Sequence, residues 1–76
     1  MYNSVYLKGG DIMAMTLKAL RVNNRMTQVE AADKLKISVD TLSNWENGKT
    51  FPDVMQIKKI EELYSVSYQD IIFLPQ

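Results

Sequence analysis

Residues 27–48, TQVEAADKLKISVDTLSNWENG, decide the fold because they place two helix start signals and one stop signal close together. Thr27 has the side chain of an N-cap, and Glu30 three residues later completes a capping box. Ser38 is a second N-cap candidate, and Asn47-Gly48 is a typical helix end. The stretch therefore predicts two short helices in direct succession.

The two predicted helices are separated only by a tight turn at Lys36-Ile37. They must therefore pack against each other. The small side chain of Ala32 lets them approach closely, while Leu42 and Trp45 are expected to face inward from the second helix. A helix-turn-helix is the simplest interpretation of this pattern.

Outside this stretch, apolar residues recur at spacings of three and four, and no segment alternates with a period of two. This pattern predicts an all-α fold of five helices and no strand. The first helix is expected from Met13 to Asn23. A fourth is capped by Asp53, and the last begins at a capping box of Ser67 and Asp70. The last helix would contain the apolar run from Ile71 to Leu74.

The amino-acid composition narrows the classes of function that we expect of the chain. The chain has 76 residues and 46% hydrophobic side chains, which suits one compact domain with a modest core. It has no cysteine and no histidine, so we expect no metal site, no cofactor, no catalytic residue and no enzyme activity. No apolar run approaches the roughly 20 residues of a membrane span, and we expect a cytoplasmic protein without a membrane partner.

The first twelve residues show no helical period and contain Gly9-Gly10. Two interpretations of 1–12 stay open: a disordered N-terminal arm, or sequence upstream of a natural start at Met13. The second arises because Lys8-Gly9-Gly10 can be encoded by a purine-rich ribosome-binding sequence. Residues 13–76 are the predicted domain in either case.

Residues 17–74 resemble the Cro and repressor family of phage helix-turn-helix proteins, also called the xenobiotic-response-element family. The resemblance rests on the pattern T-Q-x3-A-x5-S-x7-E-x-G, which runs from Thr27 to Gly48. It implies a five-helix, lambda-repressor-like domain that binds double-stranded DNA as a sequence-specific transcriptional regulator, most simply a Cro-like repressor. The sequence departs from the family pattern at Lys36, where many relatives carry a glycine that permits a left-handed turn.

The resemblance also implies roles for particular side chains. The second helix of the motif would lie in the major groove, where the residues facing away from Leu42 and Trp45 touch base edges. Those residues are Val39, Asp40, Ser43 and Asn44, with Thr41 at the margin. The expected phosphate contacts are Thr27, Gln28, Ser38, Asn47, Lys49 and Thr50. Asn47 and Gly48 would turn the chain so that backbone amides meet a phosphate.

Three charged side chains have expected roles that rest on two different arguments. The resemblance suggests that Arg21 and Glu46 form a structural ion pair between the first helix and the end of the third. Asp40 would be repelled by phosphates, so it either accepts a hydrogen bond from cytosine or stabilises its helix through the dipole.

Charge leads to the prediction of a homodimer. Nine basic residues are balanced by nine acidic ones, and the DNA-reading helix carries no Lys or Arg before Lys49. Weak monomer binding would be offset by two copies on two half-sites. The candidate interface is Leu63, Ile71, Phe73 and Leu74, unless these residues only seal the monomer core. The same neutral charge favours an alternative function, a modulator or antitoxin-like module that binds another regulator. No small-molecule ligand is predicted.

Overall fold

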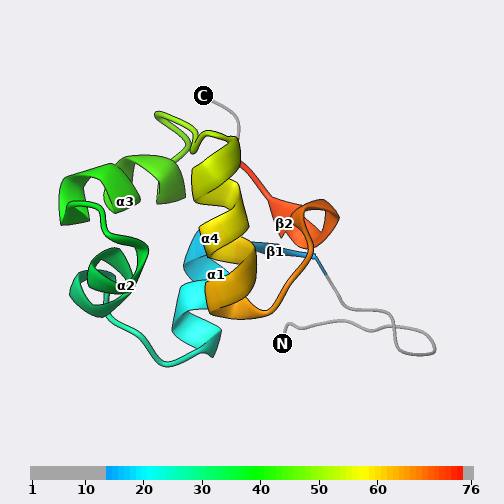
Figure 1. Cartoon of the computed structure of the whole chain (residues 1–76), viewed down its shortest axis with the longest axis horizontal. Helices are drawn as coiled ribbons and strands as arrows, with labels where there is room; N and C mark the ends of the chain where they lie inside the picture. Colours follow the sequence, from blue (N-terminus) through cyan, green and yellow to red (C-terminus); the bar gives the residue numbers. More distant parts are fainter. Residues whose placement is uncertain (1–13, 75–76) are drawn as a thin grey trace.

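The computed structural model describes residues 14–74, and Figure 1 shows their arrangement. The predicted arm over 1–12 lies outside these residues, as does Met13. In chain order the elements are β1 (Met15–Thr16), α1 (Leu17–Asn23), α2 (Gln28–Leu35), α3 (Val39–Glu46), α4 (Val54–Tyr64), a 3-10 helix η1 (Tyr68–Asp70) and β2 (Ile71–Ile72). Helices α2 and α3 lie on one side of α4, and the two strands lie on the other side (Figure 1).

Side-chain caps set where the helices of the motif begin. The Thr27 hydroxyl accepts a hydrogen bond from the Glu30 amide at 3.1 Å, and the Glu30 carboxylate accepts one from the Thr27 amide at 2.8 Å. The Ser38 hydroxyl accepts a bond from the Thr41 amide at 3.0 Å. Both predicted caps are therefore confirmed, and amides that a helix start leaves without partners are satisfied.

The turn between α2 and α3 depends on Lys36 in the left-handed region, with φ 61° and ψ 42°. This conformation lets the Ile37 amide donate to the Ala32 carbonyl at 3.0 Å, which closes the end of α2. A residue with a Cβ occupies this region at a cost of about 1–2 kcal/mol relative to its right-handed alternative. The turn that orients α3 therefore carries the steric cost of a non-glycine residue at Lys36.

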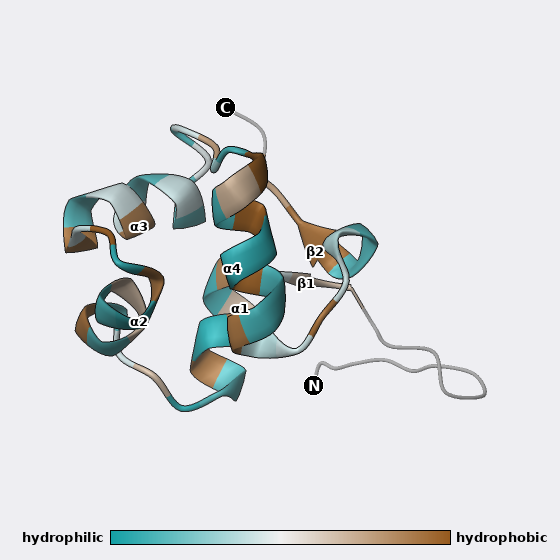
Figure 2. Ribbon diagram, viewed as in Figure 1, coloured by the Kyte–Doolittle hydropathy of each residue, from teal (hydrophilic) through white to brown (hydrophobic). Residues whose placement is uncertain are grey.

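The core lies between the four α-helices, and the apolar stripes of the helices are visible in Figure 2. Ala31 and Ala32 are almost completely buried, at 0% and 2% exposed, as the close contact between α2 and α3 requires. The other buried apolar residues are Leu17, Leu20, Leu35, Leu42, Trp45, Ile60, Tyr64 and Ile71. These side chains hold α3 against the rest of the domain through its inner face.

The mostly helical fold is confirmed, but the predicted count of five helices is not, because residues 14–74 contain four α-helices. The predicted last helix is a 3-10 turn followed by β2, and Ser67 makes no side-chain cap bond. Ile71 and Ile72 are β-branched and favour extended backbone. They pair in parallel with Met15 and Thr16, so the first helix begins at Leu17 rather than at Met13.

The pairing of β1 with β2 also removes one residue from the predicted dimer interface. Ile71 is only 7% exposed and pairs with Met15, so it belongs to the monomer core rather than to an exposed dimer surface. Leu63 and Phe73 are half-buried against the same core. Leu74 is 37% exposed. Of the four residues, Leu74 is therefore the most accessible to a partner.

Candidate nucleic-acid interface

The outer face of α3 is the surface on which the predicted base-reading residues lie. Leu42 and Trp45 are buried at 1% and 4% exposed, which fixes the rotation of α3 about its axis. The opposite face then carries four side chains of which two are exposed and two half-buried: Val39, Asp40, Ser43 and Asn44. They lie together on one side of an eight-residue helix at the edge of the molecule (Figure 1).

Local hydrogen bonds organise this outer face. The Ser38 hydroxyl donates to the Thr41 hydroxyl at 2.9 Å, and the Asn47 side-chain amide donates to the Ser43 hydroxyl at 3.3 Å. Among the residues that the structure describes, the Asn44 side-chain amide makes no hydrogen bond. Asn44 therefore has both its amide donor and its carbonyl acceptor available to a ligand.

The loop after α3 holds its backbone amides in hydrogen bonds to the end of the helix. The amides of Asn47, Lys49 and Thr50 donate to carbonyls of Ser43 and Asn44 at 2.9–3.4 Å, and the Gly48 amide donates to Trp45. These bonds satisfy carbonyls that the end of a helix would otherwise leave without partners. The contact of these backbone amides with a phosphate stays a prediction, and in this structure the amides donate within the chain. The exposed side chains of Asn47, Lys49 and Thr50 are the groups that the loop offers instead.

Arg21 and Glu46 form a buried, two-point contact between α1 and the end of α3. Arg21 Nε lies 2.7 Å from Glu46 Oε2, and Arg21 Nη2 lies 3.3 Å from Glu46 Oε1. The two residues are 9% and 5% exposed. The hydrogen bond to Glu46 raises the pKa of Arg21 above its usual value, although burial acts in the opposite direction. The guanidinium also donates to the Met26 carbonyl at 2.9 Å, so the loop before α2 is held as well.

Gln28 joins this pair from α2, a contact that sequence reasoning missed. Its side-chain Nε2 donates to Glu46 Oε1 at 3.0 Å. One carboxylate therefore receives hydrogen bonds from α1 and α2 while it belongs to α3. Gln28 was predicted to hold a phosphate, and the second hydrogen of its Nε2 remains for that role. No local pattern indicates this contact, because residues 28 and 46 meet only after the turn has formed.

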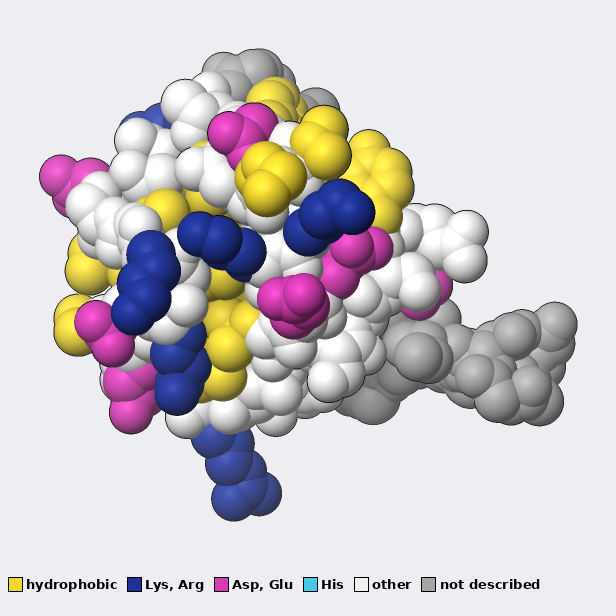
Figure 3. Space-filling view, viewed as in Figure 1, with side chains coloured by type: hydrophobic (Ala, Val, Ile, Leu, Met, Phe, Trp, Pro, Cys, Tyr) yellow, Lys and Arg dark blue, Asp and Glu magenta, His cyan; other side chains and the backbone are white. Residues whose placement is uncertain are grey.

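The other predicted phosphate contacts, Thr27 and Ser38, are exposed N-cap residues whose hydroxyls already accept amide hydrogens. Charge around the motif is mixed. Figure 3 shows basic side chains spread from the α2 side of the molecule across to α4, with acidic side chains among them. On this face, binding to phosphates would therefore rest on individual side chains rather than on a purely basic patch.

Two other kinds of site are absent from residues 14–74. This part of the chain contains no group of three or more His, Cys, Asp or Glu side chains that could hold a metal ion. It also contains no helix that is both long enough and apolar enough to cross a membrane.

Comparison with known proteins gives matches to helix-turn-helix proteins that regulate transcription. Residues 17–71 match the profile of the helix-turn-helix family. The chain is 32% identical over 56 residues to the HTH-type transcriptional activator BcrR of Enterococcus faecalis, which covers 74% of this chain and 28% of BcrR. It is 43% identical over 51 residues to the HTH-type transcriptional regulator ImmR of Bacillus subtilis strain 168, which covers 67% of this chain and 40% of ImmR. The chain thus matches less than half the length of either relative. No solved structure matches it significantly.

Proposed function

Since the chain belongs to the helix-turn-helix family, we propose that it is a sequence-specific regulator of transcription that inserts α3 into the major groove of double-stranded DNA. The observation that carries this proposal is the outer face of α3, where Val39, Asp40, Ser43 and Asn44 lie together over a buried inner face. Both named relatives are transcriptional regulators by title, which supports the same function.

The dimensions and the rigidity of α3 suit this role. An α-helix with its side chains is about 10–12 Å in diameter, and the major groove of B-DNA is about 12 Å wide, so α3 can enter it. The carboxylate of Glu46, held by Arg21 and Gln28, fixes the far end of α3 relative to α1 and α2. A rigidly held helix loses little conformational entropy when it binds, which favours sequence recognition.

The side chains suggest how the groove would be read. Asn44 has an unoccupied amide donor and acceptor, which together match the N6 and N7 edge of adenine. Val39, at 36% exposed, is suited to contact with a thymine methyl group. Asp40 lies in the first turn of α3, where the helix dipole favours a negative charge without any contact to DNA.

We further propose Cro-like repression by a homodimer, in which each copy reads one half-site. The two α3 helices of such a dimer lie about 34 Å apart, one turn of DNA. BcrR is named an activator, so the direction of regulation needs its own test. A reporter with the bound site overlapping its promoter should lose expression when the chain is produced, and a gain of expression would refute repression.

The proposed function is tested by selecting bound sequences from random DNA duplexes. A regulator of this kind should enrich one motif made of two half-sites with two-fold symmetry, centred about 10 base pairs apart. No enrichment above the unselected library would refute DNA recognition. Enrichment of a single, asymmetric half-site would keep DNA recognition and refute the dimer.

A second candidate function is a module that binds another regulator through the same surface, because acidic side chains lie among the basic ones around the motif (Figure 3). Salt separates the two functions. Binding to DNA phosphates weakens steeply between 50 and 200 mM salt, by roughly 10³ for about six contacts. An apolar contact with a protein should change by less than about threefold over the same range, because it releases few counterions.

A further inference from the structure

One hydrogen bond on the outer face of α3 joins a residue expected to contact bases to a residue expected to contact phosphates. The Asn47 side-chain amide donates to the Ser43 hydroxyl at 3.3 Å. Asn47 is the C-cap of α3 and is exposed, while Ser43 is half-buried one turn before it. Asn47 therefore acts on the same hydroxyl that Ser43 would present to a base.

The end of α3 fixes where the Asn47 side chain lies. Its backbone amide donates to the Ser43 carbonyl at 2.9 Å, so the two residues are still related by one helical turn on the same face. Gly48 then takes a left-handed conformation, with φ 75°, and the chain leaves the helix. Asn47 is thus the last residue on the outer face of α3, and its side chain points back along that face to Ser43.

The bond from Asn47 sets how the Ser43 hydroxyl can be used. A serine hydroxyl has one hydrogen to donate and two lone pairs that accept. One lone pair of Ser43 receives the Asn47 amide hydrogen, and within residues 14–74 the hydroxyl hydrogen meets no acceptor. A hydroxyl that already accepts a hydrogen bond becomes a stronger donor, because the bonds polarise one another. Ser43 is therefore prepared to donate its hydrogen toward a ligand.

The hydroxyl of Ser38, at the other end of α3, behaves differently. It accepts a hydrogen bond from the Thr41 amide at 3.0 Å and donates one to the Thr41 hydroxyl at 2.9 Å. Its hydrogen is therefore used within the cap. Of these two serines, Ser43 is the one that can offer a hydroxyl hydrogen to DNA.

The orientation of the Ser43 hydroxyl matters most when DNA excludes water from the outer face of α3. At 3.3 Å the bond from Asn47 is long, so in water it only biases the direction of the hydroxyl. In a dehydrated groove the same bond is stronger, and a donor that faces another donor loses its bond to water without replacement. The bias would then become a preference for a base that accepts.

The major-groove edges of the bases differ in what they offer to such a donor. Guanine presents the acceptors O6 and N7, and thymine presents O4. Cytosine presents an amino group, and adenine presents an amino group beside N7. A donating hydroxyl at Ser43 is therefore matched by the keto group of guanine or thymine and opposed by an amino group.

We propose that Asn47 is a positioning residue that sets the base preference of Ser43, because it holds the Ser43 hydroxyl as a donor toward a keto base. The inference rests on the proposed function, since it needs α3 to lie in the major groove. The second hydrogen of the Asn47 amide remains for a phosphate, so both roles can coexist. A phosphate contact changes the affinity for all sequences alike, whereas positioning changes the base preferred at one position.

The test is competition binding of the full chain to duplexes taken from the selected sequences. Ser43→Ala identifies the position that Ser43 reads, because that position loses its base preference. Two duplexes that differ only there, one with the keto base and one with the base pair reversed, give a ratio of dissociation constants. The wild-type chain should favour the keto base about five- to tenfold, as one hydrogen bond does.

Asn47→Asp is the most informative variant, because it keeps the shape of the side chain and reverses the hydrogen bond. A carboxylate only accepts, so the Ser43 hydroxyl would donate to it and present its lone pairs to the groove. The preference should then turn to the amino base by about threefold. Asn47→Ala leaves the hydroxyl free to rotate, and the two duplexes should bind within about twofold of each other.

The negative charge that Asn47→Asp adds has its own control. Thr50→Asp places the same charge in the same loop, at an exposed position. It should weaken binding to both duplexes alike and leave their ratio at the wild-type value. Both Asn47 substitutions are repeated with Ser43→Ala, where they should not change the ratio, because the hydroxyl through which Asn47 acts is gone. Thermal unfolding shows whether each variant is folded.

Four results would overturn the proposal: no position that changes in Ser43→Ala, a wild-type preference for the amino base there, an unchanged ratio in Asn47→Asp, or an equal shift without the Ser43 hydroxyl. Each of them leaves the proposed function standing, because the wild-type chain still enriches a DNA sequence. A wild-type chain that enriches no sequence would refute the proposed function and this inference together, since Ser43 would have no base to read.

Discussion

At the scale of single residues, the Arg21–Glu46 pair shows what a buried charge contributes. Both side chains are almost fully buried, and their charges are compensated by each other, by Gln28 and by the Met26 carbonyl. Removing one partner leaves an uncompensated charge in a low-dielectric site, whereas removing both leaves none. The pair therefore fixes the position of α3 and contributes little net stability.

We predict that Arg21→Met alone, or Glu46→Met alone, lowers the free energy of unfolding by about 3 kcal/mol or more. The double variant R21M/E46M should regain at least half of the larger loss. Urea unfolding followed by the fluorescence of Trp45 measures each value. Losses in the two single variants that simply add in the double variant would show that the charges do not depend on each other.

Tyr64 is the second informative residue. Its hydroxyl is buried and makes no hydrogen bond to any of residues 14–74. Burial, together with the negative charge of Glu46, raises the pKa of Tyr64 to about 12, and the Arg21 charge opposes this shift. We predict that Tyr64→Phe keeps the packing of the ring, removes an unsatisfied polar group and stabilises the domain by about 1 kcal/mol. Urea unfolding at pH 7 tests this, and a loss of more than 1 kcal/mol would contradict it.

The same residue predicts a dependence on pH. Because the folded-state pKa of Tyr64 is about 12 against 10 for an ordinary tyrosine, folding favours the neutral phenol. The stability from this preference is complete below pH 10 and is lost as the pH rises through 12. The wild-type chain should therefore lose more stability between pH 9 and 11.5 than Tyr64→Phe does. Tyr68→Phe, at an exposed position, serves as the control and should follow the wild type.

At the scale of elements, local signals predicted the helix-turn-helix well. Thr27 with Glu30, and Ser38 alone, are caps whose hydrogen bonds form within four residues, so the sequence contains both partners side by side. The outward face of α3 followed from Leu42 and Trp45, because helical periodicity fixes which residues lie opposite a buried stripe. These parts of the site needed no knowledge of the rest of the chain.

The elements that escaped prediction depend on partners far away in the sequence. β2 forms because Ile71 meets Met15, and a periodic pattern within residues 67–74 cannot reveal that contact. The bond from Gln28 to Glu46 and the inward-turned amides of the loop after α3 are of the same kind. Each depends on how the elements pack, so their functional consequences became visible only with the fold.

The turn between α2 and α3 supplies the prediction at this scale. Lys36 is exposed and left-handed, at φ 61°. Lys36→Gly removes the steric cost of the Cβ, partly offset by the greater flexibility of glycine in the unfolded chain, for a net gain of about 0.5–1 kcal/mol. Lys36→Ala retains the Cβ and removes the charge, so it is the control and should not gain. Thermal unfolding compares the variants, and equal midpoints for Gly and Ala would contradict the strain at Lys36.

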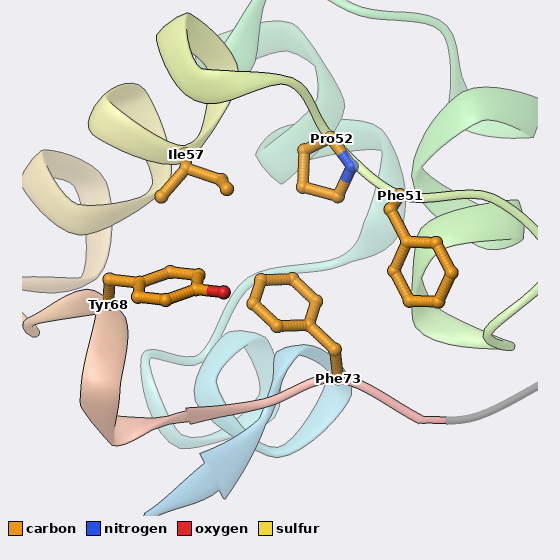
Figure 4. Close-up of a pocket in the computed structure, with 5 residues that line it drawn as sticks. All are labelled: Phe51, Pro52, Ile57, Tyr68 and Phe73. Carbon is orange, nitrogen blue, oxygen red and sulfur yellow. The ribbon is translucent and has the colours of Figure 1, made fainter.

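At the scale of the whole molecule, different sides of the domain carry different surfaces. Helices α2 and α3 lie on one side of α4, where the outer face of α3 is fixed by the carboxylate of Glu46 (Figure 1). The loop that follows α3 leads to another side of the domain, where Phe51 and Pro52 line a pocket together with Phe73 (Figure 4). Because mixed charges surround the motif, affinity would come from doubling the contacts rather than from a strong positive field.

The most direct test of the account is base recognition by Asn44 from the outer face of α3. Sequences selected by the wild-type chain should be compared with those selected by Asn44→Ala, with Asn23→Ala at the exposed end of α1 as the matched control. We predict that Asn44→Ala weakens binding to the wild-type site about 10- to 100-fold, as the loss of one bidentate base contact does, and relaxes specificity at one position of each half-site. Asn23→Ala should bind as the wild type does. Unchanged affinity and an unchanged selected sequence for Asn44→Ala would contradict the claim that this face of α3 reads DNA.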